Sequence, residues 1–260
     1  MSLPINQIIC GDNVETLRGF PADCIDLTVT SPPYDNLRTY GGHSWDFEGV
    51  AQQLWRVTKP GGVVVWVVND ATVDGSETGT SFRQALHFME IGFRLHDTMI
   101  WNKGGFSSVG DLQCRYAPVF EYMFVLSLGT PRTFNPIKDK TNRAHGRSLA
   151  GSTVRNADGS TKPVSNPNWI IPEFGQRFNV WDMPGEMQRI FDHPAPFPEA
   201  LARDHIISWS NEGDTVLDPF SGSGTTAKMA KHNGRNFIGI EVNPEYCEIA
   251  AERLRQGVLF

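Results

Sequence analysis

The sequence predicts an α/β fold built on a doubly wound, mainly parallel sheet with one inserted lobe. Short apolar runs alternate with stretches of helical spacing up to residue 126 and again from residue 198 onward. Strands that alternate with helices in this way form parallel sheets. Between the two regions the chain is rich in Asn, Ser, Gly, Pro and Arg and has few periodic apolar positions. Structureless loops of that length are uncommon inside a compact domain, so we expect a separate lobe there.

Each element before the insert is identified by its apolar pattern and by the residues that end it. The run 63–68 consists of valines around one tryptophan, which is typical of a strand buried on both faces. The stretch 45–57 has apolar residues at helical spacing and ends at a Lys-Pro-Gly-Gly turn. The expected strands are 5–10, 25–30, 63–68, 95–101 and 119–126, and the expected helices are 45–57 and 81–91.

The same alternation resumes after the insert. The chain of 260 residues, 40% of them hydrophobic, can bury one sizeable core with a smaller lobe attached. We expect helices over 198–208, 225–232 and 244–255, and strands over 215–217 and 237–241. The prediction therefore divides the chain into a first half of the α/β domain (1–128), an inserted region (129–190) and a second half of the α/β domain (191–260).

Charge and composition limit the partners and the cellular location that we expect for the protein. The net charge is -6, which alone does not suggest a nucleic-acid partner, yet residues 131–190 hold nine Lys/Arg against five Asp/Glu. No apolar run reaches about 18 residues, and the first residues lack the basic start and apolar stretch of a signal peptide. We therefore expect a cytoplasmic protein without a membrane span. The four cysteines lie at no metal-ligand spacing, so they are expected to be reduced, mostly buried and metal-free.

A glycine-rich turn, Asp218-Pro-Phe-Ser-Gly-Ser-Gly-Thr-Thr226, follows the expected strand 215–217. Its two glycines let the backbone turn tightly and approach a ligand. The next expected strand ends at Glu241, where a carboxylate can accept hydrogen bonds from two ribose hydroxyls. Ala227 replaces the third glycine of a dinucleotide fingerprint, and a carboxylate before the glycines suits a cationic amino acid better than a pyrophosphate. The pattern predicts an S-adenosylmethionine site.

A second chemical signal, Ser31-Pro32-Pro33-Tyr34, follows the expected strand 25–30. Two prolines remove two backbone donors and leave rigid carbonyl acceptors beside an aromatic ring. The exocyclic amino nitrogen of a base is a poor nucleophile until acceptors hold its hydrogens, because its lone pair is delocalised into the ring. The motif therefore predicts methylation of such a nitrogen. No cysteine follows a proline, which argues against methylation of carbon 5 of cytosine.

The two motifs, in this order, resemble the DNA amino-methyltransferases of restriction-modification and solitary modification systems, and specifically their permuted β group. The resemblance covers nearly the whole chain. It implies a circularly permuted, Rossmann-like methyltransferase fold in which residues 129–190 recognise the DNA target. It implies that Ser31, Pro32, Pro33 and Tyr34 are catalytic. It also implies that S-adenosylmethionine is bound by Asp12, Phe197, Pro198, Asp218, Phe220, Gly222, Gly224, Thr225 and Glu241.

The resemblance further implies a bacterial, archaeal or phage-encoded enzyme acting on double-stranded DNA, with the target base swung out of the stack. It allows for a homodimer and for a restriction endonuclease that recognises the same site. A leading Ser, as in Ser31, is commoner for cytosine N4 than for adenine N6, so we expect cytosine N4 with adenine N6 as the alternative. A more distant alternative is an N-methyltransferase of small molecules or protein amides. The expected DNA contacts are basic side chains: Arg38, Lys138, Lys140, Arg143, Arg147 and Arg155.

Overall fold

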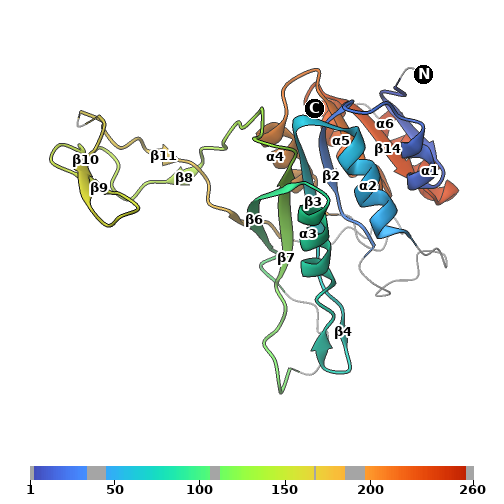
Figure 1. The fold of residues 1–260 in the computed structure, drawn as a ribbon, viewed down its shortest axis with the longest axis horizontal. Helices are drawn as coiled ribbons and strands as arrows, with labels where there is room; N and C mark the ends of the chain where they lie inside the picture. Colours follow the sequence, from blue (N-terminus) through green and yellow to red (C-terminus); the bar gives the residue numbers. More distant parts are fainter. Residues whose placement is uncertain (1–2, 34–44, 106–111, 167, 185–196, 256–260) are drawn as a thin grey trace. The chain divides into compact units, whose positions relative to one another are not determined.

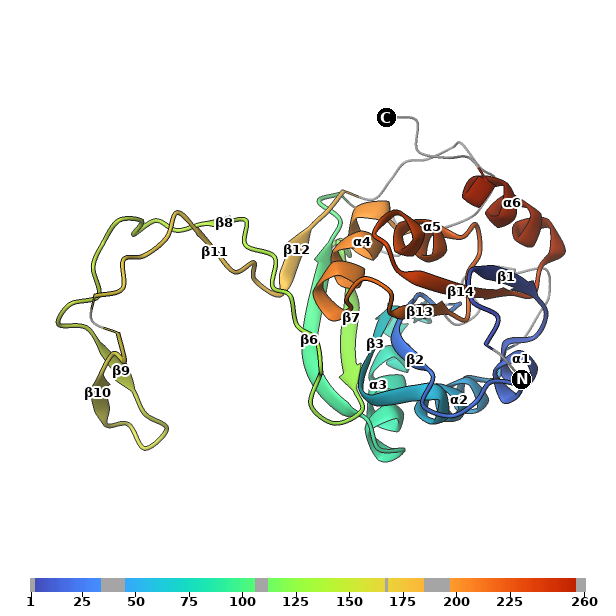
Figure 2. The same cartoon turned by 90° about the horizontal axis from the view of Figure 1, so that it is seen from above.

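The computed structural model describes residues 3–33, 45–105, 112–166, 168–184 and 197–255. It consists of two compact units, the first formed by Met1–Asn135 with Asn179–Phe260 and the second by Pro136–Phe178. The first unit, here the α/β unit (Figure 1), contains an eight-stranded sheet in the order β1-β14-β13-β2-β3-β7-β6-β12, which can be followed in Figure 2. Its strands are β1 (Gln7–Cys10), β2 (Ile25–Thr30), β3 (Thr58–Val68), β6 (Arg94–Asn102), β7 (Phe120–Ser127), β12 (Val180–Asp182), β13 (Thr215–Asp218) and β14 (Asn236–Glu241).

The sheet is mainly parallel, which confirms the predicted fold class. β1, β14, β13, β2 and β3 pair with their neighbours in parallel, and so do β12 and β6. β7 runs antiparallel to both β3 and β6. A short hairpin, β4 (Thr72–Val73) with β5 (Ser76–Glu77), follows β3.

Helices cover both faces of this sheet. Figure 2 shows α1, α2 and α3 on one face and α4, α5 and α6 on the other. α2 illustrates the cause, because it buries Val50, Leu54 and Val57 at helical spacing and is capped by Asp46, which accepts a hydrogen bond from the backbone N–H of Gly49. The helices are α1 (Asn13–Arg18), α2 (Phe47–Val57), α3 (Thr80–Glu90), α4 (Glu199–Trp209), α5 (Thr225–His232) and α6 (Pro244–Arg255).

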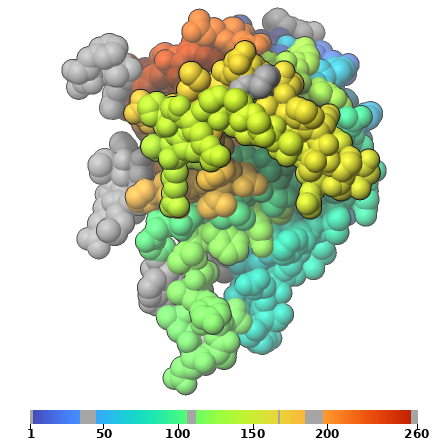
Figure 3. All heavy atoms as spheres, turned by 90° about the vertical axis from the view of Figure 1, so that its left-hand side faces the viewer, coloured from blue at the N-terminus to red at the C-terminus, as the bar shows by residue number. Residues whose placement is uncertain are grey.

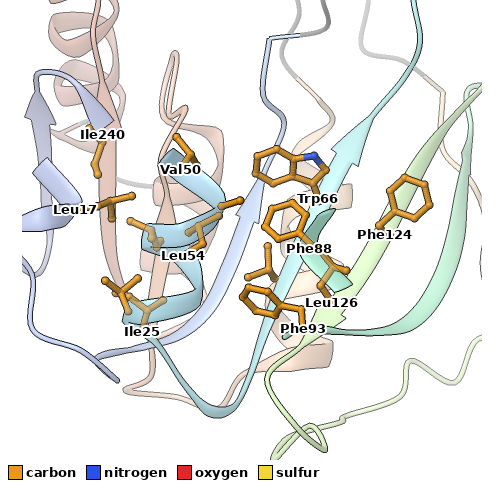
Figure 4. Close-up of a cluster of buried hydrophobic side chains, with 14 of the residues drawn as sticks. Leu17, Ile25, Val50, Leu54, Trp66, Phe88, Phe93, Phe124, Leu126 and Ile240 are labelled. Carbon is orange, nitrogen blue, oxygen red and sulfur yellow. The ribbon is translucent and has the colours of Figure 1, made fainter. Parts of the chain in front are cut away.

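Two hydrophobic clusters lie on the two faces of the sheet. The valine run of β3 supplies both, because successive side chains of a strand point to opposite faces. Val64, Trp66 and Val68 belong to the cluster under α1, α2 and α3, whereas Val63, Val65 and Val67 belong to the cluster under α4 and α5. Figure 4 shows Trp66 beside Phe88 of α3 in the first cluster. The Trp66 indole N–H donates to Gln84 Oε1 at 2.9 Å, which satisfies its one polar group.

The second unit, here the lobe, is built differently. It holds the short antiparallel pairs β8 (Lys140–Thr141) with β11 (Phe174–Gly175), and β9 (Thr153–Arg155) with β10 (Thr161–Pro163). Among its described residues no side chain is buried. Figure 3 draws the heavy atoms of the lobe as spheres in yellow-green and yellow. Its contacts include an ion pair between Arg177 and Asp139.

Two asparagines of the α/β unit stand immediately outside the lobe. Before it, Asn135 donates through Nδ2 to the carbonyls of Ile207 and Ser210, at 3.1 and 3.2 Å. After it, Asn179 donates through Nδ2 to the Thr98 carbonyl at 3.2 Å. The lobe is therefore shorter than the predicted insert 129–190, because the chain is tied to α4 until Asn135 and returns to the sheet as β12.

Several local expectations differ from the structure. Helix α1 was not expected. The predicted turn at residues 59–62 is enclosed within β3, because β3 pairs with Ile25 through Thr58 and with Leu27 through Val63, so four residues bulge out between these pairs. The expectation of mostly buried cysteines is wrong: Cys10 and Cys114 are exposed and Cys24 and Cys247 are half-buried, and none of the four forms a disulfide. Cys10 is exposed because it ends β1, the edge strand of the sheet.

None of the helices in the described parts of the chain is long and apolar enough to cross a membrane. Within the same residues, no three His, Cys, Asp or Glu side chains gather as a metal site would require.

Candidate active site

The two predicted motifs meet at one edge of the sheet. β2 leads into Ser31 and β13 ends at Asp218, and these strands are parallel neighbours. The Thr30 hydroxyl donates a hydrogen bond of 2.6 Å to Asp218 Oδ1, a contact between residues 188 positions apart. The chain leaves β2 toward β3 and leaves β13 toward β14, in opposite directions across the sheet. Open α/β sheets bind ligands at such a switch point, beyond the carboxyl ends of the strands.

Asp218 is a buried carboxylate, with 2% of its surface exposed. Burial raises its pKa from 3.8 to about 6, because removal from water disfavours the charged form. The hydrogen bonds that Asp218 accepts from the Thr30 hydroxyl and the Phe220 backbone N–H oppose this shift, and the negative charge of Glu241 adds to it. Asp218 therefore titrates in a range where moderate changes in its surroundings alter its charge.

Glu241 is held by the backbone of two turns. The Gly222 N–H donates to Glu241 Oε2 at 2.8 Å, and the Asn243 N–H donates to Oε1 at 2.9 Å. Gly222 and Gly224 have φ of 49° and 80°, where glycine is favoured. A Cβ on Gly224 would lie 2.9 Å from Ala250 Cβ, so α6 also requires glycine there. The glycines thus allow the turn to follow α6 closely and to hold the end of β14.

An ion-pair network connects the start of α5 to α4 and α6. Glu199 in the first turn of α4 binds Lys228 at 2.6 Å and Arg253 at 2.9 Å. Arg253 Nη1 donates to the carbonyl and the hydroxyl of Ser223, both at 2.7 Å, and to Thr225 Oγ1 at 3.3 Å. These contacts connect α4, α5 and α6 to the glycine-rich turn.

Asp12 lies just after the end of β1 and caps α1. Its Oδ1 accepts a hydrogen bond of 2.9 Å from the Glu15 backbone N–H, and its backbone carbonyl accepts one of 2.6 Å from the Thr16 hydroxyl. The following residue, Asn13, donates through Nδ2 to the Pro219 carbonyl at 3.2 Å. The start of α1 and the glycine-rich turn are thereby joined directly.

Aromatic rings pack against the same turn. Phe220 meets the Trp45 ring edge-to-face, with centroids 5.0 Å apart, and its centroid lies 6.2 Å from that of Trp66. Trp45 lies just before α2. Edge-to-face aromatic pairs are favourable beyond their buried area, so Phe220 is fixed to the core of the α/β unit.

The structure brings most of the predicted site residues to these turns. Ser31 and Pro33 are half-buried and Pro32 is buried. Tyr34 and Arg38 lie outside the described residues. Pro198 is buried at the start of α4, and Phe197 is half-buried and packs against the cluster under α4 and α5. The cofactor and catalytic roles of these residues stay predictions.

The basic residues expected to contact DNA, apart from Arg38, all belong to the lobe. Lys138, Arg143, Arg147 and Arg155 are exposed. Lys140 is half-buried, with its ammonium nitrogen 4.3 Å from the centroid of the Phe178 ring, and this cation–π contact occupies it. Residues 136–178 hold seven Lys/Arg against three Asp/Glu, so the lobe is basic in an otherwise acidic chain.

Sequence reasoning missed the residues that connect the two turns. Thr30 directly precedes the Ser-Pro-Pro-Tyr motif and Thr226 ends the glycine-rich run, so their positions carried a signal, but neither was given a role. Asn13, Trp45 and the Glu199 network were also missed. Their partners are remote in the sequence, and no local pattern reveals such contacts.

Comparison with known proteins decides the family. Residues 25–252 match the family model described as "DNA methylase", which covers N6- and N4-directed enzymes. The chain belongs to this DNA methylase family. It is therefore a DNA amino-methyltransferase that uses S-adenosylmethionine, as the motifs predicted.

Three relatives illustrate the match. The orphan methyltransferase M.BamHII of Bacillus amyloliquefaciens is 54% identical over 245 residues, covering 91% of each chain. The DNA adenine methyltransferase YhdJ of Escherichia coli is 29% identical over 269 residues, covering 95% of this chain and 82% of its own. A candidate DNA modification methylase of Thermus thermophilus, solved with S-adenosyl-L-methionine, is 27% identical with a TM-score of 0.63, covering 95% of this chain and 92% of its own.

Proposed function

We propose that this DNA methyltransferase modifies N4 of cytosine. The observation that carries the proposal is Ser31, the first residue of the catalytic motif, where adenine-directed relatives more often place Asp. Adenine N6 is the alternative, and the name of the relative YhdJ keeps it open. A methyltransferase of small molecules or protein amides is disfavoured by the order of the motifs and by membership in the DNA methylase family.

The donor set at the ends of β13 and β14 fits S-adenosylmethionine. Each Glu241 oxygen accepts one backbone N–H bond and keeps lone pairs for ribose hydroxyls. The Asp218 carboxylate suits the cationic amino group of the methionine part. Asp12 is assigned to the adenine amino group, and Phe197, Pro198, Phe220, Gly222, Gly224 and Thr225 to the walls of the site.

When bound, the cofactor supplies an electrophilic methyl group. The chain's own task is to present the amino nitrogen of a flipped base to it. The Ser31 hydroxyl and the Pro32 carbonyl accept hydrogen bonds from the amino group, which raises the nucleophilicity of the nitrogen. Pro33 keeps the turn rigid, and Tyr34 stacks on the base. The nitrogen loses one proton during or after the transfer.

Expression in a methylation-free host tests this proposal. The host DNA would be digested to nucleosides and examined by mass spectrometry, and sequenced to locate the modified sites. We expect N4-methylcytosine at one short sequence, and a Tyr34→Ala variant should lose most of the activity. N6-methyladenine as the only product would establish the alternative. A full methylation rate in Tyr34→Ala would contradict the assigned catalytic motif.

We also propose that the lobe binds double-stranded DNA and forms the recognition part of a three-part chain, between the catalytic half and the cofactor-binding half. Its excess of Lys/Arg and the exposure of Arg143, Arg147 and Arg155 support this role. Phosphate contacts by such side chains fix a protein on the duplex. A restriction endonuclease with the same recognition site remains a candidate partner, and a search for cleavage of unmethylated host DNA would test for it.

Helix α3 supports a further partner, a second copy of the chain. Phe82, Leu86 and Met89 are 48%, 57% and 45% exposed and form one apolar stripe, because residues four and three positions apart share a helix face. Arg83 and Glu90 flank the stripe on one side, near opposite ends of the helix. In a twofold antiparallel pair of α3 helices, Arg83 of one copy would face Glu90 of the other.

Charge exchange tests this interface. By analytical ultracentrifugation we expect Arg83→Glu alone and Glu90→Arg alone to weaken the dimer, and the double variant to restore it. Ile5→Glu, at an exposed apolar residue away from α3, is the matched control and should leave the dimer unchanged. A wild-type protein that sediments as a monomer at all concentrations would contradict the proposal.

A further inference from the structure

The ends of β2 and β13 are joined by side chains as well as by the backbone. The two strands pair in register at Leu27 with Val216 and at Thr28 with Leu217. Closer to the site, Thr30 on β2 donates to Asp218 at 2.6 Å.

A second hydroxyl makes the reverse connection. Thr226 at the start of α5 donates to the Val29 carbonyl of β2 at 3.2 Å. In the first bond a side chain of β2 donates to the glycine-rich turn. In the second, a side chain of α5, the helix after that turn, donates to the backbone of β2.

Both connections lie in the interior of the α/β unit. Thr30, Val29, Thr226 and Asp218 are all buried. A buried acceptor that loses its donor has no water to replace it, so the loss costs the full desolvation of the group. Hydrogen bonds to ionised groups are also the stronger ones. The Thr30–Asp218 bond consequently affects both the position and the charge of Asp218.

We propose that Thr30 and Thr226 are positioning residues that couple the glycine-rich turn to the turn that begins with Ser31. The bond from Thr30 orients the Asp218 carboxylate toward the cofactor. It also fixes the end of β2 and thereby the position of Ser31. The bond from Thr226 holds the same stretch of β2 against α5. The inference rests on the proposed assignments of Asp218 to the cofactor and of Ser31 to the base.

The charge of Asp218 gives this coupling a measurable signature. Burial is the largest influence on its pKa, and the charge of Glu241 raises the pKa further. The hydrogen bonds from the Thr30 hydroxyl and the Phe220 backbone N–H lower it. Removal of the Thr30 hydroxyl should raise the pKa of Asp218 above about 6, so the carboxylate would be protonated at a higher pH. Cofactor binding that needs the charged form would then be lost at a higher pH.

The test compares three isosteric or conservative variants. Thr30→Val removes the hydroxyl with little change in shape, and Thr30→Ser keeps it. Thr28→Val is the matched control on the same strand, because Thr28 is also fully buried but its hydroxyl has no hydrogen-bond partner within the described structure. The dissociation constants of S-adenosylmethionine and S-adenosylhomocysteine are measured by calorimetry between about pH 5.5 and about pH 8, a range that brackets the pKa in question.

We expect the midpoint of the pH profile to move up by about one unit in Thr30→Val, which makes binding roughly tenfold weaker below the midpoint. Thr30→Ser and Thr28→Val should keep the wild-type profile. A wild-type profile in folded Thr30→Val overturns the inference. If Thr30→Val does not fold, Thr226→Val serves instead and should lower kcat with little change in KM for DNA; an unchanged kcat overturns the inference.

The outcomes separate this inference from the proposed function. If Asp218→Asn binds both ligands as the wild type does at every pH, the assignment of Asp218 to the cofactor is wrong. If Asp218→Asn loses binding and Thr30→Val does not change the profile, the cofactor site stands and the coupling by Thr30 is wrong.

Discussion

The α/β unit buries Trp66 and Phe88 completely, whereas the described part of the lobe buries no side chain. The first unit is stabilised by two hydrophobic clusters on the two faces of one sheet. The lobe depends on short strand pairs, backbone hydrogen bonds and the Arg177–Asp139 ion pair. The functions proposed for the two units match this difference, because a rigid sheet can hold a reacting geometry, whereas an open basic lobe leaves its side chains available to a DNA duplex.

Replacement of one tryptophan in each unit tests this contrast most directly. Trp66→Ala should lower the free energy of unfolding by roughly 3–5 kcal/mol, because it empties a fully buried site and leaves Gln84 without its donor. Trp169→Ala in the lobe, at a half-exposed ring, should change it by less than about 0.5 kcal/mol. Urea denaturation measures both. Equal losses in the two variants would mean that the lobe has a core of its own.

DNA binding, in contrast to stability, should depend on side chains of the lobe rather than on the core of the α/β unit. Replacing Arg143 and Arg147 together by Gln should reduce the slope of log affinity against log salt by about 2, since each phosphate contact contributes roughly 0.9. Stability and cofactor affinity should not change. Arg18→Gln, at an exposed arginine of α1, is the control with no expected effect. A wild-type salt slope that is flat would argue against the lobe as the DNA-binding unit.

The smallest expected effect is a difference between the two units in how stability depends on pH. The pKa of Asp218 is raised by burial to about 6, so between about pH 4 and 6 the folded state binds more protons, and the contribution of this group to stability decreases as the pH rises. The pKa of Asp139 is lowered by its hydrogen bond to Arg177, so its contribution is present above the unfolded pKa and is lost on acidification. Unfolding of Asp218→Asn at about pH 5 and about pH 7.5, chosen to bracket this range, should show a smaller loss on raising the pH than the wild type. Arg177→Gln should remove the loss of hydrogen-exchange protection that lobe amides show on acidification, with protection taken relative to the intrinsic exchange rate at each pH.

The elements that could be predicted from the sequence are those with a strong apolar period. β2, α5 and α6 have the predicted bounds because each is flanked by clear terminators. α1 was missed, although Asp12 and Glu15 stand at the spacing of a capping box, because six residues give too short a period to detect. The lobe could be predicted only as an interruption, since a segment without a core leaves no apolar pattern.

The site could be predicted as two motifs but not as one assembly. The Ser-Pro-Pro-Tyr and glycine-rich runs identify the chemistry by their residue types. That Thr30 reaches Asp218 depends on β2 and β13 being neighbours in the sheet, and the order of strands follows from packing across the whole unit rather than from either motif.

The two asparagines at the borders of the lobe determine what a replacement of the lobe has to preserve. Asn135 and Asn179 attach the chain to the α4 region and to β6 before it departs and after it returns. Both donate to main-chain carbonyls, and Asn179 also donates to Asp97 Oδ1 at 3.3 Å. Main-chain acceptors are present whatever the side chains are. We therefore expect that a segment of different sequence or length can replace residues 136–178 while both attachments to the α/β unit are kept.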